Sequence, residues 1–148
     1  MKMGVFSEFS AIEYSKTLKE KTNNISITST LEDDVIFYNN KNITKIFRMK
    51  FNDIINDDLD EGIMAPKQED VKGLKEFVDN LDCDFLLVHC GAGVSRSAAI
   101  AAAINDYLKL GYDIFGDKSF SPNPTVYKIA CKEFGIAKEK EYYEDIFR

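Results

Sequence analysis

The sequence predicts an α/β fold in which a central, mostly parallel sheet of about four to five strands is covered by helices on both faces. Three observations support this prediction. Short β-branched segments alternate along the chain with stretches of helical periodicity. The apolar run 85–88 leads through a loop of small residues into the alanine-rich segment 98–110. The 148 residues, with an apolar share of 45%, suffice for one domain, 1–148, with a full core.

The first half of the chain contains one predicted helix and the first strands. Ser10 to Glu13 form a capping box, which predicts a helix from Ser10 to about Lys21. The two asparagines at 23–24 are expected to end this helix. Strands are predicted for the alternating or β-branched segments 25–28, 35–38 and 43–51, with a polar turn at 39–42.

The second half is predicted to be mainly helical around one central strand. After an acidic segment, 52–62, Pro66 suits the first turn of a helix. The apolar residues that then share one helical face are Val71, Leu74, Phe77, Val78 and Leu81. This helix leads into the buried strand that begins at Phe85. Gly111 is expected to end the alanine-rich helix that follows.

Two more helices are predicted near the C-terminus, after an ordered loop over 112–122. Asparagine is favoured at N-caps and proline at the first helical position, so Asn123 and Pro124 predict the start of a helix. This helix is expected to run to about Phe134 and to end at Gly135. A last amphipathic helix is predicted over 138–147.

The segment between the central strand and the alanine-rich helix has the composition of an anion-binding loop. The first N–H groups of a helix lack intrahelical partners and carry partial positive charge, so they bind phosphate. Gly91 and Gly93 allow the backbone to approach a ligand closely. Arg96 can donate two parallel N–H bonds to phosphate oxygens. Beside Arg96 and the helix, Cys90 is expected to be a nucleophilic thiolate. The Ser97 hydroxyl can donate a hydrogen bond to the Cys90 sulfur and help it to leave when a covalent intermediate breaks down.

The pattern His89-Cys90, five residues, Arg96-Ser97 resembles the signature of the cysteine-dependent protein tyrosine phosphatases. Its Gly-Ala-Gly-Val-Ser filling is most similar to the dual-specificity branch and to small bacterial tyrosine phosphatases. The residues implied to bind phosphate are Gly91, Ala92, Gly93, Val94, Ser95 and Arg96. The resemblance also implies that this loop lies at the carboxyl end of a central strand. The alternative is a buried structural cysteine in a Rossmann-like turn.

Phosphate transfer to Cys90 also calls for a proton donor to the leaving group, and a carboxylic acid is well suited. The resemblance implies an aspartate on a loop after a strand, a few tens of residues before the cysteine. Asp53 follows a predicted strand and lies 37 positions before Cys90. Its 51–54 context resembles the aspartate loop of small bacterial relatives. Asp57 and Asp58 are the alternatives, and each aspartate could instead belong to a solvated acidic loop.

His89 is the only histidine in the chain. We expect a buried residue that hydrogen-bonds the loop backbone and helps to keep Cys90 ionised, an interpretation that the resemblance favours over a free general base. Cys83 and Cys131 are expected to be small core residues. A resolving role for Cys83 toward oxidised Cys90 is the alternative. The stretch that begins at Asn123 also resembles a pocket-lining segment of bacterial relatives, although capping already explains it.

Composition limits the partners. A net charge of −6 disfavours nucleic acid and anionic membrane surfaces, and no apolar run has membrane-spanning length. No secretory signal is visible. Three cysteines without metal-ligand spacing indicate a reducing compartment, so we expect a cytoplasmic protein. We expect no metal or other cofactor, because a guanidinium and backbone amides supply the positive charge. A monomer is favoured.

The predicted function is hydrolysis of phosphomonoesters through a cysteinyl-phosphate intermediate, as a protein tyrosine or dual-specificity phosphatase. The partner would be a phosphorylated protein or a small phosphomonoester, bound in a shallow site. One alternative is a catalytically weak phosphoresidue-binding module. Another is a phosphatase for a phosphoinositide, an inositol phosphate or an RNA 5′-phosphate. Sulfur transfer and arsenate reduction also use a cysteine in an anion loop, but the Arg96-Ser97 pair and the upstream aspartate argue against them.

Overall fold

The computed structural model describes residues 1–148 and contains one four-stranded sheet. Its strands are β1 (Lys2–Ser7), β2 (Thr22–Thr28), β3 (Ile43–Lys50) and β4 (Phe85–Cys90). The strand order is β1-β4-β2-β3, and every neighbouring pair is parallel. This arrangement confirms the predicted α/β class with a parallel sheet. All six residues of β4 are buried, as expected for an interior strand covered on both faces.

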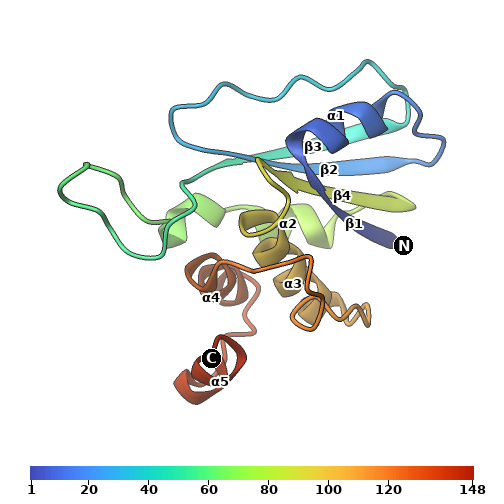
Figure 1. Ribbon diagram of the computed structural model, residues 1–148. Helices are drawn as coiled ribbons and strands as arrows, with labels where there is room; N and C mark the ends of the chain where they lie inside the picture. The colour runs from blue at the N-terminus through green and yellow to red at the C-terminus, as the bar shows by residue number, and fades with distance from the viewer.

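Helices cover the two faces of the sheet unequally (Figure 1). The helix α1 (Glu8–Ser15) lies on one face, above a small apolar cluster. The other face carries α2 (Leu74–Asp79), α3 (Arg96–Leu108) and α4 (Pro124–Glu133), which enclose the larger core. The last helix, α5 (Lys140–Ile146), follows α4 at the C-terminus. None of the helices combines the length and the apolar character that a membrane span requires.

The alanine-rich helix α3 is the centre of this larger core. Its residues from Arg96 to Asn105 are all buried. The small side chains along this stretch let the sheet, α4 and the helix backbone approach closely, and such an apolar surface on all sides is typical of an enclosed helix. The N-terminus of α3 is thereby fixed directly after the carboxyl end of β4, where the predicted anion loop lies.

Near the N-terminus the structure differs from the prediction in three ways. Residues Lys2–Ser7 form the edge strand β1, which the sequence analysis does not predict. The predicted helix start at Ser10 is wrong, because the Ser7 side chain accepts from the Ser10 backbone N and the helix begins at Glu8. The helix also ends earlier than predicted, at Ser15, because the Asn40 side chain donates to the carbonyls of Ser15 and Leu18 and so holds the chain in a turn.

The two asparagines expected to interrupt the chain lie inside β2. Asn23 is accommodated because its side chain donates to Thr44 Oγ1 and accepts from the Asp82 backbone N. The strand predicted over 35–38 is also wrong. This segment joins no strand of the sheet. Tyr38 N donates instead to the hydroxyl of Ser15, the last residue of α1.

The helix predicted across Val71 and Leu81 is divided into two shorter pieces, the 3-10 helix η1 (Gln68–Val71) and α2. Gly73 separates them because its φ of 90° lies in the left-handed region, which a helix interior excludes. Further along, α3 ends at Leu108, and its C-cap Lys109 takes the left-handed conformation two residues before the expected Gly111. The predicted cap of α4 is confirmed: Asn123 accepts from the backbone N atoms at 125 and 126.

Candidate active site

The loop between β4 and α3 presents free backbone donors. The backbone N–H groups of Gly91, Ala92, Val94 and Ser95 donate to no acceptor within the protein. Gly91 and Ala92 are exposed, so two of these donors lie at the surface of the loop. An unpaired N–H group is costly unless water or a ligand satisfies it. This loop therefore has the hydrogen-bonding capacity of an anion site at a helix N-terminus.

Cys90 lies at the start of this loop, with 2% of its surface exposed. Its Sγ is 3.0 Å from Ser97 Oγ and 3.3 Å from the backbone N of Gly93, which donates to it. Burial raises the pKa of the thiol, but the hydrogen bonds from Ser97 and Gly93 and the charge of Arg96 together outweigh burial, and the pKa lies below its ordinary value. These surroundings favour the thiolate form, which is the form that a nucleophilic cysteine requires.

The guanidinium of Arg96 is hydrogen-bonded through Nη1, whereas its Nε has no hydrogen-bond partner. Its Nη1 donates to Ser29 Oγ and to the carbonyl of Phe51, both at 3.0 Å. The residue is only 7% exposed, and its Nε is buried without any partner. A buried charged group with an orphaned donor is expensive, and an oxyanion is the natural acceptor for it. The Nε of Arg96 is thus a donor available for an anionic ligand.

The close packing of the loop depends on Gly93. Its φ of 72° is left-handed, and a Cβ there would lie 2.5 Å from the carbonyl carbon of Phe6 and from the backbone N of Ser7. We expect Gly93→Ala to lower the free energy of unfolding by about 2–4 kcal/mol, from backbone strain and overpacking combined. Denaturant unfolding monitored by circular dichroism measures this change.

Gly62→Ala is the matched control for Gly93→Ala. Gly62 has a similar left-handed φ of 69°, but a Cβ added there would meet no atom within 4 Å. Its substitution should therefore cost only the backbone strain, about 1 kcal/mol. Equal losses for the two variants would show that the loop tolerates a side chain at Gly93.

His89 is fully buried and both of its ring nitrogens have partners. Nε2 lies 2.6 Å from Ser26 Oγ, and Nδ1 lies 3.2 Å from the carbonyl oxygen of Cys90. Burial lowers the pKa of His89 and outweighs the bond to the Cys90 carbonyl, which raises it, while the charges of Arg48 and Arg96 add smaller lowering effects. A neutral, enclosed imidazole orients the loop backbone and has no free nitrogen to act on a substrate.

The three candidate aspartates have different surroundings. Asp53 follows β3, and its Oδ1 accepts from Ser95 Oγ at 2.7 Å and from Asn123 Nδ2 at 3.0 Å. Asp57 is paired with Lys67 at 2.8 Å, whose hydrogen bond holds the pKa of that carboxyl below its ordinary value. Asp58 lies in a local bridge with Ile63, away from the anion loop. Only Asp53 contacts the loop that carries Cys90.

The structure thus brings Cys90, Arg96, Ser97, His89 and Asp53 to the carboxyl end of the sheet. Neither the models of protein families nor the curated proteins contain a match to this chain. The carboxyl ends of β2, β3 and β4 contribute to it together, which is where open parallel sheets bind ligands.

Two serines of the site have no sequence signal of their own. Ser26, within β2, holds His89, and Ser29, just after β2, holds Arg96 across 67 positions. The positions of both serines follow from the sheet topology, because β2 is the immediate neighbour of β4. Once the strand beside β4 is known, a polar residue near its carboxyl end is a candidate for the site.

Cys83 is too far from Cys90 for direct pairing. The five residue steps of β4 alone span about 16 Å, whereas a disulfide needs Cα atoms within about 7 Å. Burial raises the pKa of Cys83, which is therefore a poor thiolate. Cys131 is buried in the core, and burial raises its pKa to about 11. Cys131 is the core residue that the sequence predicts, whereas Cys83 is only half-buried and packs against the edge of the core. A resolving role for Cys83 would need a rearranged fold.

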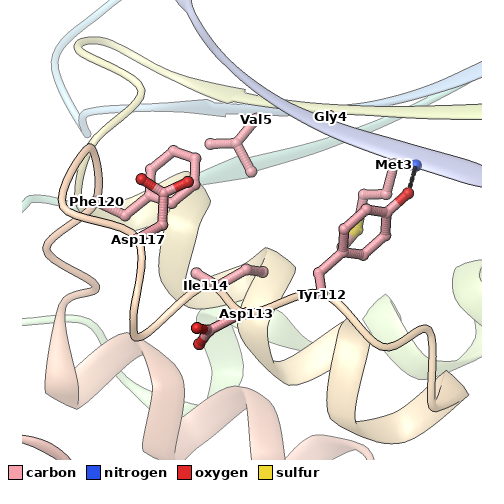
Figure 2. A pocket seen from close by; sticks show the side chains of 8 residues that line it. All are labelled: Met3, Gly4, Val5, Tyr112, Asp113, Ile114, Asp117 and Phe120. Carbon is pink, nitrogen blue, oxygen red and sulfur yellow. Dashed lines mark hydrogen bonds between the residues drawn. The ribbon is translucent and has the colours of Figure 1, made fainter.

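Two cavities lie near this region. One, of about 220 Å³, adjoins Asp53 and is lined by Asp53, Ile55, Ser95, Ser121, Pro122, Asn123 and Pro124. The other, of about 270 Å³, lies between β1 and the loop before α4 (Figure 2). Its residues are Met3, Gly4, Val5, Tyr112, Asp113, Ile114, Asp117 and Phe120. The second cavity contains neither a nucleophile nor a cation, so it lacks the groups that phosphate chemistry requires.

Proposed function

We propose that this protein hydrolyses phosphomonoesters through a cysteinyl-phosphate intermediate. The observation that carries the proposal is the buried Arg96 Nε, which lacks an acceptor in the same site as an activated thiol. A phosphoryl group would supply that acceptor and would also satisfy the free amides of the loop. Its phosphorus atom would then be held within reach of Cys90 Sγ, which is the arrangement that nucleophilic displacement needs.

In the first step, Cys90 Sγ attacks phosphorus in line with the ester oxygen. The S–P bond forms as the P–O ester bond breaks, and the carboxyl of Asp53 gives its proton to the departing oxygen. Arg96 and the loop amides stabilise the three equatorial oxygens, whose charge is redistributed in the transition state. The products of this step are the free alcohol or phenol, ionised Asp53 and a phosphorylated cysteine.

In the second step, water attacks the phosphocysteine. Ionised Asp53 takes one proton from that water as the new P–O bond forms. The S–P bond breaks and returns its electron pair to sulfur, where the hydroxyl of Ser97 stabilises the thiolate by hydrogen bonding. Inorganic phosphate leaves, and both Cys90 and Asp53 recover their starting states.

The charges around the loop support a substrate with one phosphate group. The backbone N of Glu8 donates to Gly91 O at 3.0 Å, which places the start of α1 beside the loop. Hydrogen bonds from Ser29 lower the pKa of Glu32, so a carboxylate lies near the Ser29 anchor of Arg96. This carboxylate would repel any phosphate beyond the one that Arg96 binds. A phosphorylated tyrosine, serine or threonine side chain, or a small phosphomonoester, is therefore favoured over phosphoinositides, inositol polyphosphates and RNA ends.

The test is hydrolysis of phenyl phosphate by the wild type and by Asp53→Asn. Phenolate is a poor leaving group, so losing the proton donor should lower kcat by about 10²–10⁴-fold. The wild type should show a bell-shaped pH dependence of kcat, and Asp53→Asn should lose its basic limb while retaining the acid limb. Release of inorganic phosphate measures both results.

Asp57→Asn is the matched control, because it removes an aspartate of the same acidic segment that is bound to Lys67 instead. It should retain kcat within about threefold of the wild type, as expected for a surface ion pair. If Asp53→Asn kept the wild-type kcat and Asp57→Asn lost it, Asp57 would be the general acid. Tight binding of phosphate without any hydrolysis by the wild type would favour a phosphoresidue-binding module.

A further inference from the structure

Asn123 connects three parts of the site. Its Oδ1 accepts from Thr125 N at 2.9 Å and from Val126 N at 3.2 Å, which caps α4. Its Nδ2 donates to Asp53 Oδ1 at 3.0 Å and to Ile54 O at 3.1 Å. The backbone N of Asn123 donates to Ser95 O in the phosphate loop. The buried residue Asn123 therefore fixes α4 and the aspartate loop through its side chain and the phosphate loop through its backbone.

Ser95 gives Asp53 its second hydrogen bond. The Ser95 hydroxyl donates to Asp53 Oδ1 at 2.7 Å, so this side chain faces the aspartate and only its backbone N–H is left for a ligand. Sequence analysis places Ser95 among the phosphate-binding residues without this contact. The bond links residues that are 42 positions apart and joins the two loops directly.

We propose that Ser95 and Asn123 are positioning residues that hold the Asp53 carboxyl in the orientation that delivers its proton. This inference rests on the proposed phosphatase function. Asp53 is exposed, so an unrestrained carboxyl at this position would sample several rotamers in water. Two donors from two different elements select one of them. The acid is therefore in place before the substrate binds, which removes a loop-ordering step from catalysis.

The hydrogen bonds also determine which oxygen carries the proton. Both donors converge on Oδ1, and a carbonyl-type oxygen has two lone pairs to accept with. The proton of the neutral acid is thus left to Oδ2, which makes no hydrogen bond within the protein. When the P–O bond breaks, Oδ2 releases that proton to the departing oxygen, and the resulting carboxylate is stabilised on Oδ1 by the same two donors.

The experiment compares two aryl esters that depend differently on an acid. Phenyl phosphate needs a proton at its leaving oxygen, whereas 2,4-dinitrophenyl phosphate releases a stable phenolate without one. Ser95→Ala, Asn123→Ser and the double variant should each be measured with both esters. For the double variant we expect kcat to fall about tenfold or more with phenyl phosphate and less than about threefold with the dinitrophenyl ester.

The same substitutions in the Asp53→Asn background test whether they act through Asp53. There they should change kcat for phenyl phosphate less than about twofold, because the group that they position no longer donates a proton. Asn123→Ser retains a side-chain oxygen at the N-cap of α4, which limits the loss of stability. Thr125→Val is the matched control: it removes the bond from Thr125 Oγ1 to Ile55 O, so the aspartate loop loses a tether that does not touch Asp53.

Thr125→Val should leave the ratio of the two kcat values within about twofold of the wild-type ratio. Equal losses with both esters, or undiminished losses in the Asp53→Asn background, would overturn the positioning role while leaving the phosphatase proposal intact. A wild type that hydrolyses neither ester would overturn the phosphatase proposal and the positioning role together. Thermal unfolding of each variant verifies that the compared proteins are folded.

Discussion

Cys90→Ser is expected to abolish turnover, with kcat for any aryl phosphate at least about 10⁴-fold below the wild type. A serine hydroxyl is not ionised near neutral pH, and the loop around Cys90 contains no free base to activate it, because both nitrogens of His89 are engaged. The hydrogen bonds from Ser97 and Gly93 favour a thiolate over a thiol, but they are too weak to ionise a serine hydroxyl at neutral pH. Rapid quenching and mass spectrometry should detect a phosphate adduct on Cys90 in the wild type.

The pH dependence of this thiol has a defined sign. Because the pKa of Cys90 is lowered, the thiolate persists to a lower pH than that of an ordinary cysteine and is lost as the pH falls through that lowered value. Alkylation of the free enzyme by iodoacetamide should follow the same curve as the acid limb of kcat/KM. Cys83→Ser is the matched control, since burial raises the pKa of Cys83 and its loss should leave kcat unchanged. A Cys90→Ser variant that still turns over would mean that another group attacks phosphorus.

The region from Phe85 to Leu108 could be predicted from the sequence because its signals are local. An apolar run, two glycines and a row of alanines specify a strand, a turn and a buried helix without reference to distant residues. The same applies to Asn123, whose capping role depends only on the residues that follow it. Where local chemistry agrees with the tertiary structure, the sequence is sufficient.

The errors arise where tertiary contacts override local preference. Segment 35–38 has strand composition, but its Tyr38 N donates to a side chain of α1 and not to a strand, and Asn23 lies in a strand because neighbouring residues satisfy its amide. The edge strand β1 is short and contains Gly4, so its pattern is weak. Spacing and resemblance place Asp53 first among the aspartates, but its contacts with a distant serine and asparagine could not be predicted from the sequence.

The second large effect is expected for Arg96→Lys, which keeps the positive charge but should lower kcat/KM by about 10³-fold. The wild-type guanidinium divides its donors: Nη1 bonds Ser29 Oγ and Phe51 O, while the buried Nε is left for the anion. A lysine ammonium is a single compact donor group and cannot bind both anchors and two phosphate oxygens in one plane. The loss of one such oxyanion donor costs about 10²–10³-fold.

Arg48→Lys is the matched control, because Arg48 lies on β3 beside Asp34 and makes no contact with the anion loop. It should retain kcat/KM within about threefold of the wild type. Inhibition by vanadate, a phosphate-like oxyanion, should weaken for Arg96→Lys and not for Arg48→Lys. An Arg96→Lys variant within about tenfold of wild-type kcat/KM would show that charge alone suffices, since a 10³-fold loss corresponds to about 4 kcal/mol of transition-state stabilisation. The proposal that Arg96 binds the anion through more than one N–H donor, including Nε, would then be wrong.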